Sequence, residues 1–223
     1  MVLNITIEDS QPGIVTIEII EFVDGLKKVT KKRISFDNFV NIINESTIQS
    51  EKMRIGKIPT GYYDGIIDVN GNYECLVVIP EGIKPLIYYD KTYIIPFPNL
   101  LFFFQVKNFI LTSSKVFALK SQNINDNTLV YRYPFGNVSE EGSICWGLKN
   151  NQKIESKHNS MKDVEEFISM FFGSPTNDDH WMSKRVKEKY VTQRCLIESL
   201  VKESRFPSEL LVNTNIKVGD LLN

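Results

Sequence analysis

An asparagine and a cysteine eight residues apart, Asn137 and Cys145, have the spacing and the side chains for covalent chemistry. The residues between them are mostly loop formers and include a glycine, Gly142. Such a loop can fold back and bring the amide of Asn137 close to the thiol of Cys145. When an amine attacks a thioester on such a thiol, an oxyanion forms, and an amide N–H stabilises it without being consumed. The pair is therefore a candidate acyl-transfer site.

The alternative for Cys145 is a structural role, because free cysteine is among the most buried residue types and packs as a small hydrophobe. The turn-rich segment before it indicates instead a thiol on a loop beside a scaffold, where reactive groups are often placed. We therefore expect Cys145 to be reachable by solvent after the last strand of a sheet. Cys75 lies in a strand pattern and Cys195 in a helix pattern, so both are predicted to be structural. The three thiols should differ in reactivity.

The segment around Cys145 resembles the active-site segment of ubiquitin-conjugating enzymes. There a His-Pro-Asn triplet precedes the catalytic cysteine at this same offset, through a turn that ends Gly-x-Ile-Cys. Phe135-Gly136-Asn137 stands in the place of that triplet, so the asparagine and the cysteine match, whereas the histidine and the proline do not. Phe135 can neither hydrogen-bond nor titrate, and we expect it to pack beneath the loop.

Further short motifs extend this resemblance over roughly residues 96–181. Their order is similar to that of a bacterial branch of the conjugating-enzyme superfamily, the prokaryotic family that includes the PRTRC system protein B. Members of this branch lack the histidine of the triplet and carry another histidine after the cysteine. The motifs are residues 95–102, residues 116–120, residues 128–131, Pro134-Phe135-x-Asn137-Val138 and Gly142-x-Ile144-Cys145-x-Gly147.

His180 best fits the place of that downstream histidine. A histidine beside Cys145 could stabilise the thiolate or accept a proton from an attacking amine. The charges of Asp178 and Asp179 would favour its protonated form if they lie near it. The alternative is a surface histidine that caps a helix directly after it. The only other histidine, His158, lies in a charged segment and is expected to be solvated.

Trp146 follows the cysteine, where conjugating enzymes usually have an aliphatic residue. Its ring could form a substrate-binding wall that keeps water from the thioester, or it could anchor the loop; the sequence leaves both open. The pair Glu140-Glu141 is of a kind that is more often solvated than catalytic. The sequence contains neither a glycine-rich phosphate loop nor a metal-ligand cluster, so we expect no cofactor and no metal.

The composition is that of an ordinary soluble protein of the reducing cytoplasm. The chain has 223 residues, 42% of them hydrophobic, and a net charge of −1, so it lacks a basic footprint for nucleic acid. Its three cysteines form neither a disulfide framework nor a Cys-x-x-Cys metal pair. Acidic residues at 8 and 9 are unlike a signal peptide, and the longest apolar run, residues 94–106, is too short to span a bilayer. We expect neither a membrane nor a nucleic-acid partner.

The order of elements predicts an α+β fold with an antiparallel sheet. Two hairpins are expected at Asp24-Gly25 and at Asn70-Gly71, and Ser35 should cap a short helix whose apolar stripe runs from Phe36 to Ile43. Proline at 96 and 98 should separate the strands around it. Further strands are expected at 86–89, 93–95, 100–106, 116–119 and 129–133, and helices from Ser160 to Gly173 and over about residues 183–203.

This order is also that of the ubiquitin-conjugating (UBC) fold. We therefore predict a UBC-like antiparallel β-meander with flanking helices, preceded by an N-terminal β-hairpin extension. The expected domains are residues 1–35, the hairpin extension packed on the core, and residues 36–223, the UBC-like domain with its C-terminal helices.

The resemblance implies that Cys145 accepts a ubiquitin-like protein from a ThiF-like activating enzyme and transfers it to an amine. A JAB-type peptidase is often encoded nearby, and no cofactor is needed because the activating enzyme consumes the ATP. The missing triplet histidine leaves a second hypothesis open, a non-catalytic member of the fold that binds a ubiquitin-like protein or an assembly partner. A third is a cysteine hydrolase that uses Cys145 and His180.

Overall fold

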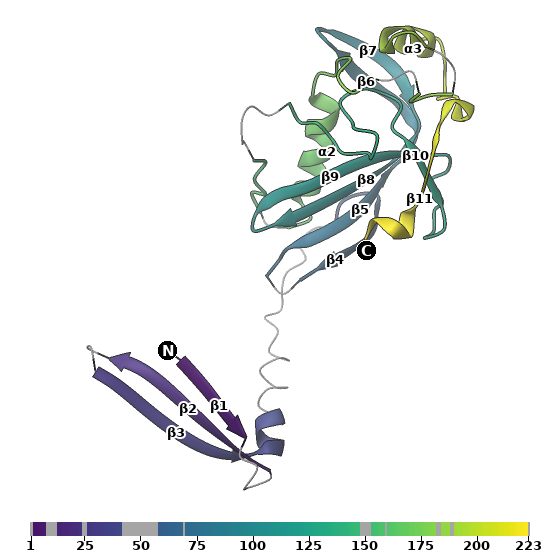
Figure 1. Cartoon of the computed structure of the whole chain (residues 1–223). Helices are drawn as coiled ribbons and strands as arrows, with labels where there is room; N and C mark the ends of the chain where they lie inside the picture. The colour runs from purple at the N-terminus through teal and green to yellow at the C-terminus, as the bar shows by residue number, and fades with distance from the viewer. Residues whose placement is uncertain are drawn as a thin grey trace. The chain divides into compact units, whose positions relative to one another are not determined.

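The chain divides into two compact units, Met1–Met53 and Arg54–Asn223 (Figure 1). The computed structural model describes residues 2–7, 13–23, 26–41, 58–68, 70–147, 153–158, 160–181, 184–187 and 190–222. The predicted boundary after residue 35 and the packing of residues 1–35 on the core stay predictions.

The first unit contains a three-stranded antiparallel sheet in the order β1-β2-β3. Its strands are β1 (Val2–Ile7), β2 (Ile14–Val23) and β3 (Leu26–Ser35). Val23 pairs with Leu26, which confirms the predicted hairpin, although its turn residues lie outside the described part of the chain. The Ser35 hydroxyl accepts a 3.2 Å hydrogen bond from the N–H of Asn38, as expected of a cap for the helical residues 36–41. Ile43, the last residue of the predicted stripe, lies outside the described residues.

The second unit is built on a six-stranded antiparallel sheet in the order β11-β10-β9-β8-β5-β4. The predicted α+β class and antiparallel pairing are thus confirmed. A separate two-stranded hairpin, β6 (Gly82–Tyr88) and β7 (Lys91–Phe97), stands between β5 and β8 in the chain. The sheet strands are β4 (Tyr62–Ile67), β5 (Tyr73–Ile79), β8 (Asn99–Lys107), β9 (Ile110–Leu119), β10 (Leu129–Arg132) and β11 (Asn213–Lys217).

The Asn70-Gly71 turn joins β4 to β5 as the sequence predicts. The Asp68 carboxylate accepts hydrogen bonds from the N–H groups of Asn70 and Asn72, at 2.8 and 2.9 Å. Gly71 has a φ of +79°, a conformation that costs glycine little. The turn therefore sets the register of the first hairpin of the sheet.

Both faces of the central strands are covered, which explains why β8 is almost continuously apolar. Side chains alternate along a strand, so Phe102 and Phe104 enter one core while Leu101 and Phe103 enter the other. The first core contains side chains of the helices α2 (Asp163–Gly173) and α3 (Gln193–Leu200). The second is closed by Val130, Val218 and the partly buried Ile216, Leu221 and Leu222.

The predicted long helix over residues 183–203 is wrong in its first half. Val186 instead forms a bridge with Leu211, and the N–H of Lys187 donates to the carbonyl of Leu210 at 2.9 Å. The helix α3 begins only at Gln193, where the Thr192 side chain accepts a hydrogen bond from the N–H of Cys195. Val201, directly after α3, is 51% exposed.

The chain then continues into two short 3-10 helices and β11, a strand that the sequence did not predict. The 3-10 helices are Ser208–Leu210 and Val218–Leu221. None of the helices that the structure describes is long and apolar enough to cross a membrane. α2 lies against one side of the sheet, and α3 stands beside the β6–β7 hairpin (Figure 1).

Candidate functional site

Cys145 lies in the loop after β10, and its side chain is exposed. Its N–H donates a 2.8 Å hydrogen bond to the carbonyl of Asn137, and a bridge between Val138 and Ile144 closes the loop on itself. The N–H of Ile144 donates to the carbonyl of Ser114, which fixes the loop to β9. The accessible position predicted for the thiol is confirmed. The loop does not follow the last strand of the sheet, because β11 joins it from the C-terminal end.

Two glycines allow this loop to lie close to its neighbours. Gly142 has a φ of +86°, and a Cβ there would lie 2.6 Å from the Phe117 ring. Gly136, in the place of the triplet's proline, has the carbonyl oxygen of Asn177 only 2.3 Å from where its Cβ would be. Its N–H also donates to the side-chain oxygen of Gln193, at the start of α3. The loop is thus packed between the sheet and the C-terminal segment.

Asn137 ties the cysteine loop to residues 175–179. Its amide nitrogen donates to the carbonyl of Pro175 at 2.7 Å, and its amide oxygen accepts from the N–H of Asn177 at 3.4 Å. Its backbone N–H donates to the carbonyl of Asp179 at 3.1 Å. An amide nitrogen carries two N–H bonds, so one of them is engaged by Pro175. The oxyanion role of Asn137 stays a prediction.

A narrow pocket lies beside Cys145, between its loop, the β6–β7 hairpin and the end of α2. Its volume of about 20 Å³ has room for about one water molecule. An attacking amine or a protein chain must therefore approach Cys145 from its exposed side. The lining residues are Pro85, Leu86, Tyr133, Gly136, Asn137, Ile144, Cys145, Trp146, Phe171, Phe172, Ser174 and Thr176.

Phe135 packs beneath the loop, as predicted. It is fully buried, and its ring centroid lies 5.0 Å from that of Phe97 and 5.5 Å from that of Tyr133. The aromatic ring that replaces the triplet's histidine therefore contributes to the core, and no titratable group stands at this position.

The comparison with protein families agrees with this geometry. Residues 77–214 match the family model described as Prokaryotic E2 family D. The chain belongs to this family. The matched residues include the cysteine loop, both helices and most of the six-stranded sheet. Neither the curated proteins nor the solved structures gave a match. Membership of an E2 family supports a ubiquitin-conjugating-like role, with a ubiquitin-like protein and an activating enzyme as general partners.

Trp146 of this family D protein is anchored to the sheet. Its Nε1–H donates to the Ser114 hydroxyl at 2.9 Å, and its half-buried ring packs against the core. The anchoring role that the sequence left open is thus present in the structure. Because the ring also lines the pocket beside Cys145, the role as a wall stays a prediction.

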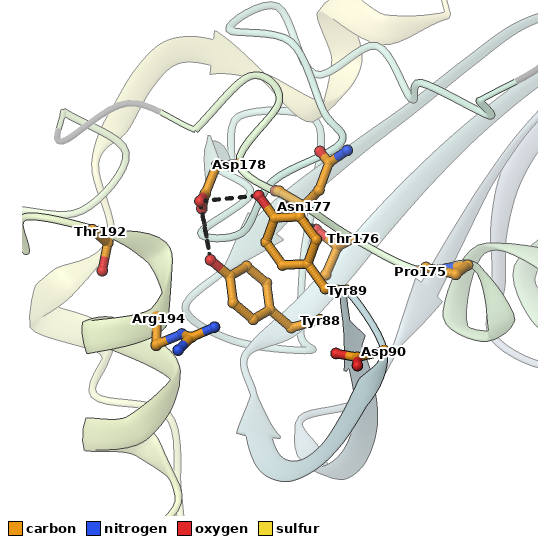
Figure 2. Close-up of a pocket in the computed structure, with 9 residues that line it drawn as sticks. All are labelled: Tyr88, Tyr89, Asp90, Pro175, Thr176, Asn177, Asp178, Thr192 and Arg194. Carbon is orange, nitrogen blue, oxygen red and sulfur yellow. Dashed lines mark hydrogen bonds between the residues drawn. The ribbon is translucent and has the colours of Figure 1, made fainter.

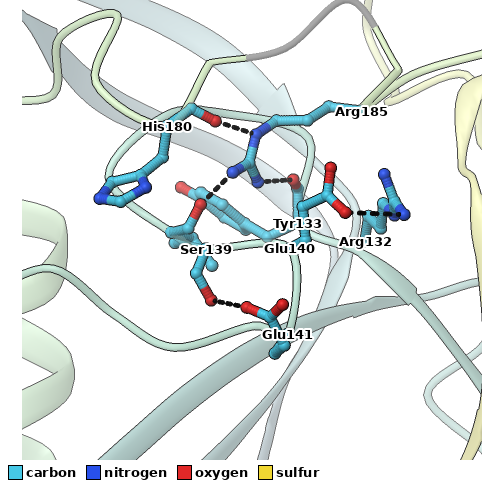
Figure 3. A network of polar contacts seen from close by, with 8 residues as sticks. Arg132, Tyr133, Ser139, Glu140, Glu141, His180 and Arg185 are labelled. Atoms are coloured by element: carbon cyan, nitrogen blue, oxygen red, sulfur yellow. Dashed lines mark hydrogen bonds and ion pairs between the residues drawn. The ribbon is translucent and has the colours of Figure 1, made fainter.

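His180 contributes its backbone to the site. Its carbonyl accepts a 2.7 Å hydrogen bond from Nε of Arg185, while its exposed imidazole points away from that guanidinium (Figure 3). It is not among the residues that line the pocket beside Cys145. The alternative of a cap for a helix directly after it is wrong, because α3 begins only at Gln193. A chemical role for His180 stays a prediction.

Arg185 is the residue of this site that the sequence did not reveal. Its buried guanidinium donates to three backbone carbonyls, those of Tyr133, Val138 and His180 (Figure 3). Burial lowers its pKa to about 10, which still leaves it protonated at neutral pH. It therefore clamps the cysteine loop to the segment around His180. No local pattern marks a lone arginine in a polar segment for such a role.

The acidic pair of the loop is engaged in surface contacts. Glu140 lies 3.5 Å from the Arg132 guanidinium, and Glu141 accepts a 2.8 Å hydrogen bond from the Ser139 hydroxyl. That hydrogen bond lowers the pKa of Glu141. Within the described parts of the chain, no group of three or more His, Cys, Asp or Glu side chains could hold a metal ion.

Proposed function

We propose that this family D protein is a ubiquitin-conjugating-type thioester transferase in which Cys145 carries the modifier. One observation carries the proposal. The Cys145 thiol is exposed, and the backbone N–H of Cys145 donates to the carbonyl of Asn137, which holds the two residues together. A ThiF-like activating enzyme supplies the C-terminus of a ubiquitin-like protein. An amine accepts it.

The chemistry consists of two acyl transfers. The Cys145 thiolate first attacks the activated C-terminal carbonyl, a C–S bond forms, and the bond from that carbon to the group supplied by the activating enzyme breaks, so that this group leaves with the electron pair. An amine then attacks the thioester carbon, a C–N bond forms, and the C–S bond breaks to return Cys145 as a thiolate. The N–H of Asn137 that Pro175 leaves available would stabilise the intermediate oxyanion. Since Phe135 cannot accept the amine's proton, His180 is the proposed histidine of the site, acting after a shift of its loop or through water.

The finer relationship is to the branch that includes the PRTRC system protein B. The absence of the triplet histidine and the downstream His180 support it, and a JAB-type peptidase is then a further expected partner. A His180→Ala variant tests the assignment. A slower transfer with an altered pH profile is expected, and a profile identical to that of the parent would remove His180 from the chemistry.

The central experiment combines the protein with a ThiF-like activating enzyme, a ubiquitin-like protein and ATP. We expect an adduct that is cleaved by dithiothreitol and is absent for Cys145→Ala. Cys195→Ser is a matched control, because Cys195 is also exposed but lies on α3. An adduct that persists in Cys145→Ala and is lost in Cys195→Ser would contradict the assignment of the nucleophile.

A non-catalytic binding protein is the second candidate. It is favoured by the hydrogen bond that engages the Asn137 amide with Pro175 and by the missing triplet histidine. Binding of the ubiquitin-like protein with no adduct under the same conditions would establish it.

A further inference from the structure

A second and much larger pocket opens beside the cysteine site, between the β6–β7 turn, residues 175–178 and the start of α3 (Figure 2). Its volume of about 910 Å³ is within the range of small-molecule binding sites. The polar and aromatic side chains that matter here are those of Tyr88, Tyr89, Asp90, Asp178 and Arg194. None of them belongs to the candidate acyl-transfer machinery.

Two tyrosines hold the Asp178 carboxylate at one side of this pocket. The Tyr88 hydroxyl lies 3.0 Å from both of its oxygens, and the Tyr89 hydroxyl lies 3.4 Å from one. Burial and the Asp178 charge raise the pKa of Tyr88 to about 12, so Tyr88 remains a donor. The two rings meet edge to face, 4.8 Å between centroids. An oriented carboxylate beside aromatic rings is a surface that attracts an ammonium group.

Arg194 brings the opposite charge to the same pocket. Its guanidinium carbon lies 5.8 Å from the centroid of the Tyr88 ring (Figure 2). Among the residues that the structure describes, no carboxylate lies within ion-pair distance of Arg194. A guanidinium fork binds carboxylates in two parallel hydrogen bonds. The pocket therefore presents the carboxylates of Asp178 and Asp90, aromatic rings and the Arg194 guanidinium together, which is complementary to a ligand that carries both a positive and a negative group.

Residues 175–177 are the wall that this pocket shares with the cysteine site. Thr176 lines both pockets, and its backbone pairs with β6 through hydrogen bonds of 2.7 Å to Ile87 and 2.8 Å from Tyr89. On the other side of this segment, the Asn137 side-chain amide donates to the carbonyl of Pro175, and the Asn137 carbonyl accepts a hydrogen bond from the N–H of Cys145. A ligand held in the large pocket is thus separated from the thiol by a single extended segment.

We propose that the large pocket binds the α-amino acid group of a lysine-type acceptor, with the α-ammonium at Asp178 and the α-carboxylate at Arg194. The side-chain amine would extend over the segment around Thr176 and approach Cys145 from its exposed side. The reaction of this amine at Cys145 rests on the proposed function. In that reaction the amine nitrogen bonds to the thioester carbon, Cys145 leaves as a thiolate, and the proton lost by the amine passes to that thiolate or to water.

The chemistry of the binding group can be tested on the full-length protein without any thioester. We would titrate ¹⁵N-labelled protein with L-lysine, with L-lysinamide, which lacks the carboxylate, and with Nα-acetyl-L-lysine, which lacks the α-ammonium. The backbone amides of Tyr89, Thr176 and Arg194 report binding. We expect L-lysine to bind more tightly than either analogue; equal binding of lysinamide would contradict the assignment of the α-carboxylate to Arg194, and equal binding of acetyl-lysine would contradict the assignment of the α-ammonium to Asp178.

Two variants test the assigned charges. Asp178→Asn should weaken L-lysine binding by about tenfold or more, and Arg194→Gln should abolish any preference for L-lysine over L-lysinamide. Glu198→Gln and Arg205→Gln are matched controls, because both side chains are exposed and neither lines the pocket. Their affinity should equal that of the parent.

Three results would overturn the proposal. They are no shift of the three amides with L-lysine, equal binding of lysine blocked at both ends, and unchanged affinity in Asp178→Asn. Because binding is measured on the free protein, a chain that binds L-lysine but forms no adduct contradicts the proposed transferase function alone.

Discussion

Among single residues, the three cysteines show how burial governs thiol chemistry. Cys75 is fully buried in β5, and burial raises its pKa to about 12. Cys145 and Cys195 are exposed, one on the loop and one on α3. Only a thiolate is a good nucleophile, so Cys75 is inert in the folded protein at neutral pH.

Alkylation should separate these thiols. With iodoacetamide at pH 8, we expect Cys145 and Cys195 to be modified in the folded protein and Cys75 only after unfolding. Peptide mass spectrometry measures each site. Modification of Cys75 at the rate of the other two, without denaturant, would contradict the burial argument.

The buried Cys75 thiol should make the stability of the protein depend on pH. Because the folded pKa of Cys75 lies above its ordinary value of 9.0, the unfolded state loses this proton first as pH rises. The free energy of unfolding should therefore have the full contribution of Cys75 below pH 9 and lose it between pH 9 and about 12. Urea titrations of the parent and of Cys75→Ala across this range measure it, and parallel curves would contradict the prediction.

Two substitutions of Asn137 separate the chemical role of its side-chain amide from the strain of its backbone conformation. Its φ of +60° strains alanine but not glycine. Asn137→Gly and Asn137→Ala should both keep adduct formation and slow discharge to lysine by about a hundredfold, the cost of one oxyanion donor. Both variants lose the hydrogen bonds to Pro175 and Asn177, so Asn137→Ala should be less stable than Asn137→Gly by the strain at positive φ, about 1 kcal/mol of unfolding free energy. Unchanged discharge in a stable Asn137→Gly variant would leave only the turn role.

Among the elements, two links join the cysteine loop to the C-terminal segment. One is the Arg185 guanidinium on the carbonyls of Tyr133, Val138 and His180. The other is Gly136, which presses against the carbonyl of Asn177 and donates to Gln193. Both links bridge segments far apart in the chain, so the geometry of the cysteine loop depends on residues well beyond it.

Replacing Arg185 should destabilise the fold strongly. Arg185→Met leaves three carbonyls without their donor, and we expect a loss of about 2–4 kcal/mol in the free energy of unfolding. Urea denaturation measures the loss. Arg205→Met is a matched control, because the Arg205 side chain is 81% exposed and its carboxylate partner is 3.8 Å away. Equal effects of the two substitutions would contradict the clamp.

A methyl group at Gly136 should also lower the free energy of unfolding. The new Cβ of Gly136→Ala would lie 2.3 Å from a backbone oxygen, which cannot rotate away. Overpacking of this kind costs about 1–3 kcal/mol. Gly173→Ala is the control, since its Cβ would meet nothing within 4 Å and alanine favours a helix. A destabilisation of Gly136→Ala no larger than that of Gly173→Ala would contradict the argument.

The sequence predicted turns, strands and loops correctly where the signal came from neighbouring residues. The Asn70-Gly71 turn, the strands around Phe102 and Phe117 and the loop position of Cys145 follow from neighbouring residues. The first half of the helix predicted over residues 183–203 was wrong: Val186 is buried like Ile197 of α3, but it pairs with Leu211 in extended structure. Arg185 was missed because its partners Tyr133 and Val138 lie 52 and 47 residues away.

At the scale of the whole molecule, the two hydrophobic cores belong to one unit. Every member of both core clusters, from Tyr62 to Leu222, lies within Arg54–Asn223. The first unit has its own sheet with its own strand pairing. The family match, residues 77–214, falls entirely within the second unit. This division makes the second unit the part of the chain that should fold and act by itself.

Removing residues 1–53 tests this division. We expect residues 54–223 to unfold in one cooperative transition, because both cores are complete without the first unit. If residues 1–35 pack on the core, as the sequence predicts, the shortened chain should have a lower Tm, by about 2–4 °C for each kcal/mol of lost contact. Differential scanning calorimetry of both chains measures the two effects. A broad, non-cooperative transition of the shortened chain would contradict its autonomy, and an unchanged Tm would contradict the packing of residues 1–35 on it.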